Sequence, residues 1–239
     1  MRQNWPERLY LVRHGQSQGN VARDAADEAG LHEIAIDVRD VDVPLSELGI
    51  RQAEAAGRWF ASRPRDERPE IICREGALAD GPAHTVVDER LREREFGIFD
   101  RLTTVGIRER FPEEAAHRRR LGKFYHRPPG GESWADVILR LRSAMNTINL
   151  HDCNKRVRIV CHQVVVLCFR YILEGLDEET ILKIDKQGEV LNCGIAAYDF
   201  DPDAHGICIP ELALWNYGAP LEAEGARKTS APDAMAGTR

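Results

Sequence analysis

Arg13, His14 and Gly15 stand side by side in the sequence and are the residues best suited to chemistry. The planar guanidinium of arginine matches phosphate oxygens, and a glycine lets the backbone approach an anion closely. Neutral imidazole is nucleophilic near pH 7, so His14 can attack phosphorus and carry a phosphoryl group covalently. The same three residues also suit a surface arginine beside a packed histidine, so the surrounding sequence has to decide between the two interpretations.

His14 and His162 each follow a short apolar run, residues 8–12 and 156–161, that is typical of a buried strand. Helical patterns separate these runs, which predicts a mainly parallel sheet with helices on both faces, a three-layer α/β/α sandwich. Ligands of such sheets bind beyond the carboxyl ends of the strands. We therefore expect the two imidazoles to meet at that edge.

The spacing of apolar residues and the capping residues predict the remaining elements. Helices are expected at residues 17–29, 46–62, 103–111, 112–121, 133–149 and 164–173. Further strands are expected at residues 70–73, 85–87, 189–200 and 206–214. The length fits a single domain over residues 1–218, and the small and polar residues 219–239 predict a flexible C-terminal tail.

The composition is that of an ordinary globular protein, with 43% hydrophobic and 30% charged residues. A net charge of −6 argues against a general electrostatic grip on nucleic acid or acidic membranes. No apolar run approaches the roughly 20 residues of a membrane span, and the N-terminus has no apolar signal core. Six cysteines without ligand spacing predict reduced thiols in a cytoplasmic protein and no zinc site.

Five blocks of sequence resemble the histidine phosphatase (phosphoglycerate mutase-like) superfamily. They are Leu11-Val12-Arg13-His14-Gly15-Gln16-Ser17 with Asn20, Asp42-Val43-Pro44-Leu45-Ser46-Glu47-Leu48-Gly49 with Gln52-Ala53, Leu91-Arg92-Glu93-Arg94-Glu95-Phe96-Gly97, Gly130-Gly131-Glu132-Ser133, and Val160-Cys161-His162-Gln163. Any one block is weak evidence, whereas five in the right order over most of residues 8–200 are strong evidence. The blocks therefore indicate this superfamily.

The resemblance implies that His14 is the nucleophile and becomes phosphohistidine. It also implies that Arg13, Asn20 and His162 hold phosphoryl oxygens. Phosphoryl transfer depends mostly on positioning and on charge stabilisation around the transferring group, which these residue types can supply. On this basis we expect no cofactor and no metal ion.

Glu93 is the general acid that the resemblance implies: it would protonate the leaving oxygen and then activate water. A carboxylic acid donates at neutral pH only if its site raises its pKa. Residues 88–95 are a mixed run of acids and arginines, which by itself is more typical of a solvated surface. Glu95 is the rival for the acid role, and the position of Glu93 within its block favours Glu93.

Gln163 after His162, and Lys123-Phe124-Tyr125 ahead of the Gly-Glu-Ser block, resemble the bisphosphatase domain that acts on fructose 2,6-bisphosphate. Arg119 stands four residues before Lys123, so these two cations are expected to share a helix face. Together with Gln163 they are candidates to bind a second phosphate or carboxylate of the substrate. A solvated basic surface is the alternative.

The chain departs from the family pattern after its second predicted strand. Members usually carry a Ser-Pro-x-x-Arg-Ala-x-x-Thr block there, whose arginine is another phosphate clamp. Residues 73–84 lack this block and are too few for the customary helix. Arg74 is a candidate to replace the clamp, although it does not stand where the motif places its arginine. Losing one such contact commonly costs ~10²–10³ in rate, so a weak phosphatase and a catalytically silent relative both stay open.

The sequence thus predicts a metal-independent phosphatase that hydrolyses phosphomonoesters of small anionic metabolites through phospho-His14. A phosphoglycerate mutase is the near alternative. A binding module that holds a phosphorylated ligand or a partner protein is the alternative from another class. The expected partner is a small phosphorylated metabolite rather than nucleic acid or a membrane. The sequence does not set the oligomeric state, for which a dimer is one option.

Overall fold

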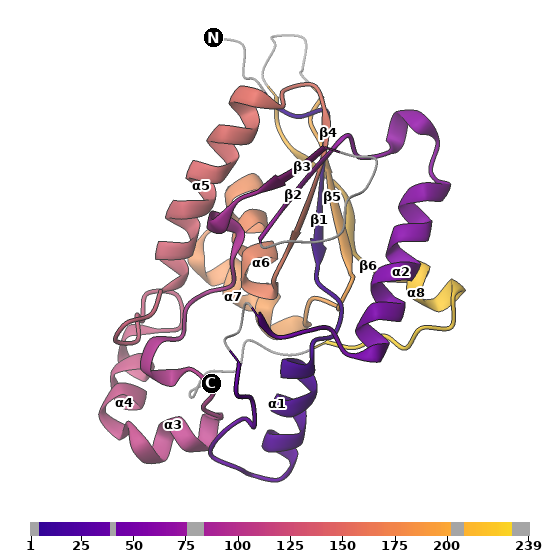
Figure 1. Cartoon of the computed structure of the whole chain (residues 1–239). Helices are drawn as coiled ribbons and strands as arrows, with labels where there is room; N and C mark the ends of the chain where they lie inside the picture. The colour runs from indigo at the N-terminus through magenta and orange to yellow at the C-terminus, as the bar shows by residue number, and fades with distance from the viewer. Residues whose placement is uncertain (1–4, 39–41, 76–83, 202–207, 231–239) are drawn as a thin grey trace.

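One mixed sheet forms the centre of the protein. The computed structural model describes residues 5–38, 42–75, 84–201 and 208–230 (Figure 1). The strands are β1 (Arg8–Arg13), β2 (Ile71–Arg74), β3 (His84–Val87), β4 (Arg156–Cys161), β5 (Ile195–Asp199) and β6 (Glu211–Tyr217), in the spatial order β3-β2-β4-β1-β5-β6. The first four of these strands pair in parallel, and β5 joins β1 and β6 in antiparallel pairs. The predicted mainly parallel sheet is confirmed.

Helices cover both faces of this sheet. They are α1 (Gln18–Glu28), α2 (Glu47–Ser62), α3 (Thr104–Arg110), α4 (Pro112–Leu121), α5 (Trp134–His151), α6 (Gln163–Leu173), α7 (Glu178–Gln187) and α8 (Ala219–Ala223). α5, α6 and α7 lie on one side of the sheet, and α2 and α8 lie on the other (Figure 1). The three-layer α/β/α sandwich is therefore confirmed. No helix among the described residues is long and apolar enough to cross a membrane.

Several predicted element bounds differ from the structure. The strand predicted at 189–200 is confined to β5, and the one predicted at 206–214 becomes β6, which begins and ends later; residues 206 and 207 lie outside the described residues. The helix α7 was not predicted, although Asp177 caps it by accepting a hydrogen bond from the Thr180 amide. Three of its ten residues are apolar, and one of these, Ile181, is fully buried, so the helix does carry an apolar face that the sequence interpretation missed.

The two faces of the sheet have separate cores because side chains alternate along each strand. Leu11 and Ile159 point to the α5–α6 side, where they belong to a large cluster that includes the fully buried Trp134. Tyr10 and Val12 point to the other side and pack against α2. Alternate residues of one strand thus anchor different helical layers and hold the strand ends in place.

Among the described residues, the α2 side of the sheet has exposed and half-buried positions at β2 and β3. Ile72 of β2 and Thr85 of β3 are neighbours in register and both are half-buried, and Val87 at the end of β3 is 58% exposed. The chain between these strands is the short segment that lacks the family block, and its residues 76–83 lie outside the described residues. Among the described elements, none packs over this flank as α2 packs over β1.

The prediction of a flexible tail from residue 219 is wrong for residues 219–230. Leu221 of α8 is fully buried and clusters with Ala55 of α2. The side-chain amide of Gln52 in α2 donates to the carbonyl oxygen of Arg227 and to the hydroxyl of Thr229, each at 2.8 Å. The small residues were interpreted as a disorder signal, but here they pack closely on α2. Residues 231–239 of the predicted tail lie outside the described residues.

Candidate active site

His14 and His162 meet at the carboxyl edge of the sheet, as the strand pattern predicts. β1 and β4 are parallel neighbours with Arg13 level with Cys161, so the residue after each strand is a histidine at the same edge. The His14 amide donates to the carbonyl of Cys161 at 2.9 Å, which ties the two strand ends together. The ring centroids of the two histidines are 5.0 Å apart. A group bound between them would contact both imidazoles.

The His14 side chain has a defined tautomer. Its Nδ1 lies 2.7 Å from the carbonyl oxygen of Gly15. A carbonyl oxygen can only accept a hydrogen bond, so Nδ1 carries the proton and Nε2 keeps its lone pair in the neutral ring. A lone pair on Nε2 is what nucleophilic attack on phosphorus requires.

Burial keeps this imidazole neutral. Desolvation, together with the positive charges of His162 and Arg13, lowers the pKa of His14 from 6.5 to about 3. The ring therefore stays unprotonated through neutral and mildly acidic pH. The imidazole thus keeps a nucleophilic lone pair over this pH range.

Gly15 has a packing role that the sequence interpretation did not anticipate. A Cβ atom at Gly15 would lie 2.4 Å from the carbonyl oxygen of Gly49, and one at Gly49 would lie 2.0 Å from the carbonyl of Gln16. The two glycines let the loop after β1 lie directly on the first turn of α2. The Gln16 amide then donates to the buried side chain of Gln52 at 2.9 Å. This contact fixes the loop that carries His14.

The histidine pair lies in a pocket of about 710 Å³. Its lining includes seven of the nine predicted site residues, namely Arg13, His14, Asn20, Arg74, Glu93, His162 and Gln163. These residues come from four separate parts of the chain, so the fold brings together what the sequence keeps apart. The cations among them can stabilise the charge of a bound phosphoryl group.

Gln163 contacts Arg13 within the pocket. The guanidinium Nη1 of Arg13 donates to the Gln163 side-chain oxygen at 2.8 Å and to the carbonyl of Val190. Arg13 and Gln163 are 3% and 4% exposed, so both are held in a packed environment. Gln163 lines the pocket, so its binding to substrate stays a prediction, and its observed contact orients Arg13.

Asn20 is fixed by a hydrogen bond in the first turn of α1. Its side-chain oxygen accepts from the Ser17 amide at 3.0 Å in a capping box. A second asparagine of this region, Asn192, was missed by sequence reasoning. Asn192, which is fully buried, donates to the carbonyl of His14 at 3.2 Å and accepts from the Thr229 hydroxyl at 3.0 Å. Residues 192 and 229 therefore support the backbone at His14. No local pattern in the sequence marks such a long-range polar contact.

Glu93, rather than Glu95, lies at the pocket. Glu95 is exposed and does not line the pocket. Arg140 of α5 donates to the carbonyl of Glu93 at 3.2 Å and forms a bidentate pair with Glu132. Glu132 also accepts from the Glu95 amide at 3.1 Å. The Gly-Glu-Ser block thus holds in place the backbone segment that presents Glu93 to the pocket.

Glu75 is a pocket residue that the sequence did not single out. Its carboxylate oxygen lies 2.9 Å from Nε2 of His162, and both side chains are 20% exposed. Arg74, directly before it, is 6% exposed at the end of β2 and lines the same pocket. The altered segment therefore begins by adding one cation and one carboxylate to the site. The negative charge of the Glu75 carboxylate, beside Nε2 of His162, repels a phosphoryl group that binds the same nitrogen.

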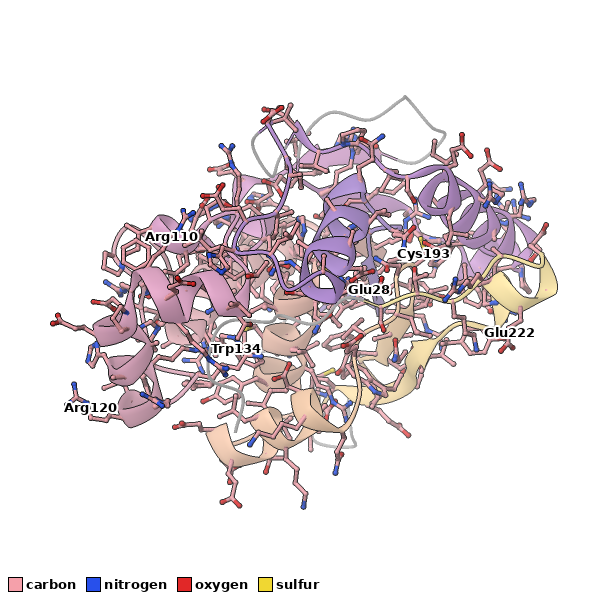
Figure 2. All side chains as sticks on the ribbon, turned by 90° about the horizontal axis from the view of Figure 1, so that it is seen from below. Glu28, Arg110, Arg120, Trp134, Cys193 and Glu222 are labelled. Atoms are coloured by element: carbon pink, nitrogen blue, oxygen red, sulfur yellow. The ribbon has the colours of Figure 1, made fainter. Side chains whose placement is uncertain are left out.

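Arg119 and Lys123 are not at the pocket. α4 ends at Leu121, so Lys123 lies beyond the helix and the predicted shared helix face does not exist. Lys123 forms an ion pair with Asp185 at 2.7 Å, and Arg119 is exposed. Neither lines the pocket. Figure 2 shows Arg110 and Arg120 at the outer rim of α3 and α4, on the opposite side of the molecule from Glu222 in α8.

A possible metal-binding group lies away from this site. Among the described residues, side chains of Glu114, His117 and His126 offer ligand atoms within 4.8 Å of one another, and none of the three lines the pocket. The six cysteines are free, and burial raises the pKa of Cys73 and Cys193 to about 12, so these thiols are protonated and unreactive. A metal-free reaction stays a prediction.

Known proteins resemble this chain in both sequence and structure. A family model of the histidine phosphatase superfamily (branch 1) matches residues 9–208. The 6-phosphofructo-2-kinase/fructose-2,6-bisphosphatase of Gallus gallus is 29% identical over 179 residues, which are 73% of this chain and 34% of that protein. The 2,3-bisphosphoglycerate-dependent phosphoglycerate mutase of Methylorubrum extorquens is 29% identical over 192 residues, 74% of this chain and 84% of the mutase. The chain thus spans about a third of the bifunctional relative.

Solved structures show the same fold. A mycobacterial glucosyl-3-phosphoglycerate phosphatase with inorganic phosphate has a TM-score of 0.65 at 22% identity and covers 90% of this chain and 99% of its own. The alpha-ribazole phosphatase of Shigella flexneri has a TM-score of 0.64 at 19% identity, with 87% and 96% covered. The family match over residues 9–208 shows that the chain belongs to the histidine phosphatase superfamily.

Proposed function

We propose that this protein is a phosphatase that hydrolyses phosphomonoesters of small anionic metabolites through a phosphohistidine on His14. The observation that carries the proposal is the His14 tautomer: Nδ1 is occupied by the Gly15 carbonyl, so the lone pair is on Nε2. The depressed pKa of His14 supports the same role, because the ring stays neutral while phosphate esters are bound.

The proposed reaction has two steps. His14 Nε2 attacks phosphorus while the bond to the leaving oxygen breaks, and the protonated Glu93 carboxyl gives its proton to that oxygen. The Glu93 carboxylate then takes a proton from water, whose oxygen attacks phosphorus and breaks the N–P bond. Inorganic phosphate leaves and the imidazole is restored. Arg13 and His162 line the pocket beside His14, where positive charge stabilises the transferring group.

Turnover of an aryl phosphate tests the proposal. Wild type, His14→Ala and His151→Ala are assayed at pH 5 and pH 7; His151 is an exposed histidine at the end of α5 and serves as the control. Activity in wild type and His151→Ala, lost in His14→Ala, is the expected result. Activity retained in His14→Ala would contradict the role of His14, and activity lost on adding a chelator would contradict a metal-free mechanism.

Two other outcomes identify the alternative functions. A mutase, which the likeness to the Methylorubrum extorquens enzyme favours, would interconvert phosphoglycerates and release little inorganic phosphate. A binding module would bind phosphate esters in an Arg13-dependent way and turn none over. The missing phosphate-clamp block at residues 73–84 favours this second alternative, because a lost contact to the transferring phosphoryl group lowers turnover.

A further inference from the structure

A trough extends the pocket from the histidine pair down the sheet face beside α2. Its floor includes Val12 of β1 and Val160 of β4, with Arg158 further down β4. Its wall is one face of α2, formed by Ala53, Gly57 and Phe60 at helical spacing. The small residues Ala53 and Gly57 on this wall leave the trough room for a ligand.

Arg158 is an unusual residue for this position. It is level with Tyr10 and Ile72 in the sheet and alternates with the buried Val157 and Ile159, so its side chain is on the α2 face. Such a mid-strand position in a sheet covered on both faces usually holds an apolar residue. Here a permanently charged guanidinium occupies it.

The charge of Arg158 is poorly compensated. Its Nε is buried and has no hydrogen-bond partner among the described residues, and burial is the cause that lowers its pKa. Its guanidinium carbon lies 4.8 Å from the ring centroid of Phe60, a cation–π contact. Such a contact offsets only part of the cost of removing a charge from water. An anion from outside the chain would supply the missing compensation.

We propose that Arg158 is a second anion subsite, which binds a negatively charged group at the far end of a phosphomonoester whose reacting phosphate lies at His14. The inference rests on the proposed function for the identity of the reacting end. The substrate class is accordingly an elongated bis-anion, with a phosphate at one end and a phosphate or carboxylate at the other.

The register gives the length of this substrate. Arg158 stands four residues before His162, and an extended strand advances about 3.3 Å per residue. The two subsites are therefore separated by about 13 Å along the strand. Arg74 is level with Val160, close to the edge, so it belongs to the phosphoryl end rather than to the far end. The apolar floor between them suits the carbon body of the ligand.

Binding of synthetic ligands tests the subsite. Hexyl phosphate and 1,6-hexanediol bisphosphate are titrated by calorimetry into the His14→Asn variant, which cannot form phosphohistidine and so does not consume them. The bisphosphate should bind about tenfold or more tightly than the monophosphate, as expected for a charge-assisted contact. Adding Arg158→Gln should remove the difference and leave hexyl phosphate binding unchanged. Shorter diol bisphosphates should lose the advantage.

Arg156→Gln is the matched control. Arg156 is on the same strand and pairs with Glu7 and Glu70 at the opposite edge, so removing it changes the net charge equally. It should preserve the preference for the bisphosphate. Equal affinity of the two ligands, or the same loss with Arg156→Gln as with Arg158→Gln, would overturn the subsite. Because binding rather than turnover is measured, this result is separate from the test of catalysis.

A steric variant covers the case in which Arg158→Gln does not fold. A Cβ atom at Gly57 would meet nothing within 4 Å, so Gly57→Leu adds a side chain to open space in the trough wall without a clash in the core. It should weaken hexanediol bisphosphate binding about tenfold and leave inorganic phosphate unaffected. Ala61→Leu, an exposed position of α2 outside the trough, is its control. Unchanged bisphosphate binding in Gly57→Leu would contradict the proposal.

Discussion

The carboxyl edge of β1 and β4 differs sharply from the flank formed by β2 and β3. At the first, the strand ends are joined by backbone hydrogen bonds, and Asn192 and Gln52 hold the loop that carries His14. At the second, Val87 is exposed and the connection lacks the family block. Among the described residues, one half of the site is thus packed in the manner of a protein core (the packed half), whereas the flank of β2 and β3 carries an exposed side chain (the open half).

The comparison indicates that His14 and the wall of the pocket formed by Arg74 and Glu75 are positioned independently. The contacts that orient His14 come from β4, α2 and residues 192–229, none of which belongs to the altered segment. Shortening the β2–β3 connection therefore leaves the nucleophile in place. What it changes is the electrostatics of the opposite wall, where Arg74 and Glu75 now line the pocket.

The largest predicted effect concerns Glu93, the proposed acid, which follows β3 in the chain and lines the same pocket. Glu93→Gln should lower kcat for a phosphate ester with a poor leaving group by about 10²–10⁴-fold, because proton transfer to the leaving oxygen is lost. An ester whose leaving group needs no proton should be affected much less. Glu95→Gln is the matched control, since Glu95 is exposed and outside the pocket. If Glu95→Gln shows the larger loss, the assignment of the acid is wrong.

Arg74 tests whether the open half still contributes a phosphate clamp. Arg74→Gln should lower kcat/KM for an aryl phosphate by about 10²–10³-fold if its guanidinium stabilises the transferring phosphoryl group. Arg68→Gln, an exposed arginine ahead of β2, should leave kcat/KM unchanged. An effect of less than about threefold for Arg74→Gln would mean that the clamp has been lost without replacement.

Substitution of Glu75 tests how a negative charge on the same wall of the pocket affects phosphate binding. Its carboxylate pairs with His162 at 2.9 Å, so Glu75→Gln removes a negative charge that competes with phosphate. We expect the Kd for inorganic phosphate, measured by calorimetry, to fall about tenfold, which corresponds to about 1.4 kcal/mol. Glu70→Gln is the control. Glu70 lies at the other end of β2, so this variant shows how phosphate affinity changes when one negative charge is removed away from the pocket. Weaker phosphate binding in Glu75→Gln would instead make Glu75 a positioning residue for His162.

The smallest predicted effect is on the pH dependence of the free energy of unfolding, which arises from the burial of His14. An unfolded histidine binds a proton below pH 6.5, whereas the pKa of folded His14 is about 3, so the unfolded state holds more protons between these values. The free energy of unfolding should therefore decrease as pH falls from 6.5, by at most about 1.4 kcal/mol per pH unit from this group.

His14→Gln should remove that part of the pH dependence, as measured by urea unfolding at pH 7 and pH 5. The stability difference between His14→Gln and wild type is expected to shift in favour of the variant at the lower pH. His151→Gln, at an exposed histidine, should show no such shift. Parallel pH profiles for wild type and His14→Gln would show that His14 is solvated and readily protonated.

The sequence predicted the packed half of the site better than the open half. Two apolar strands that each end at a histidine suffice to place His14 and His162 at one edge, because parallel strands end together. Glu75 could not be predicted in this way, since its contact with His162 depends on the path of a shortened connection. The support that Asn192 and Thr229 give to His14 was also missed, because polar contacts over 37 residues or more leave no periodic pattern.

The errors at Arg119, Lys123 and residues 219–230 share one cause. Local spacing placed Arg119 and Lys123 on one helix, yet the helix ends between them at Leu121. Small polar residues were interpreted as a tail, yet Leu221 finds a buried site on α2. In each case tertiary packing determined the structure, whereas composition and spacing report only the local preference of the chain.

Trapping the covalent intermediate tests the central claim most directly. Wild type, Glu93→Gln and His14→Asn are mixed with an activated aryl phosphate, quenched in alkali during turnover to preserve phosphohistidine, and mapped by peptide mass spectrometry. The account predicts phosphate on His14 in wild type, more of it in Glu93→Gln because water is no longer activated, and none in His14→Asn. Turnover without a phosphorylated His14, or phosphate carried on His162 instead, would contradict it.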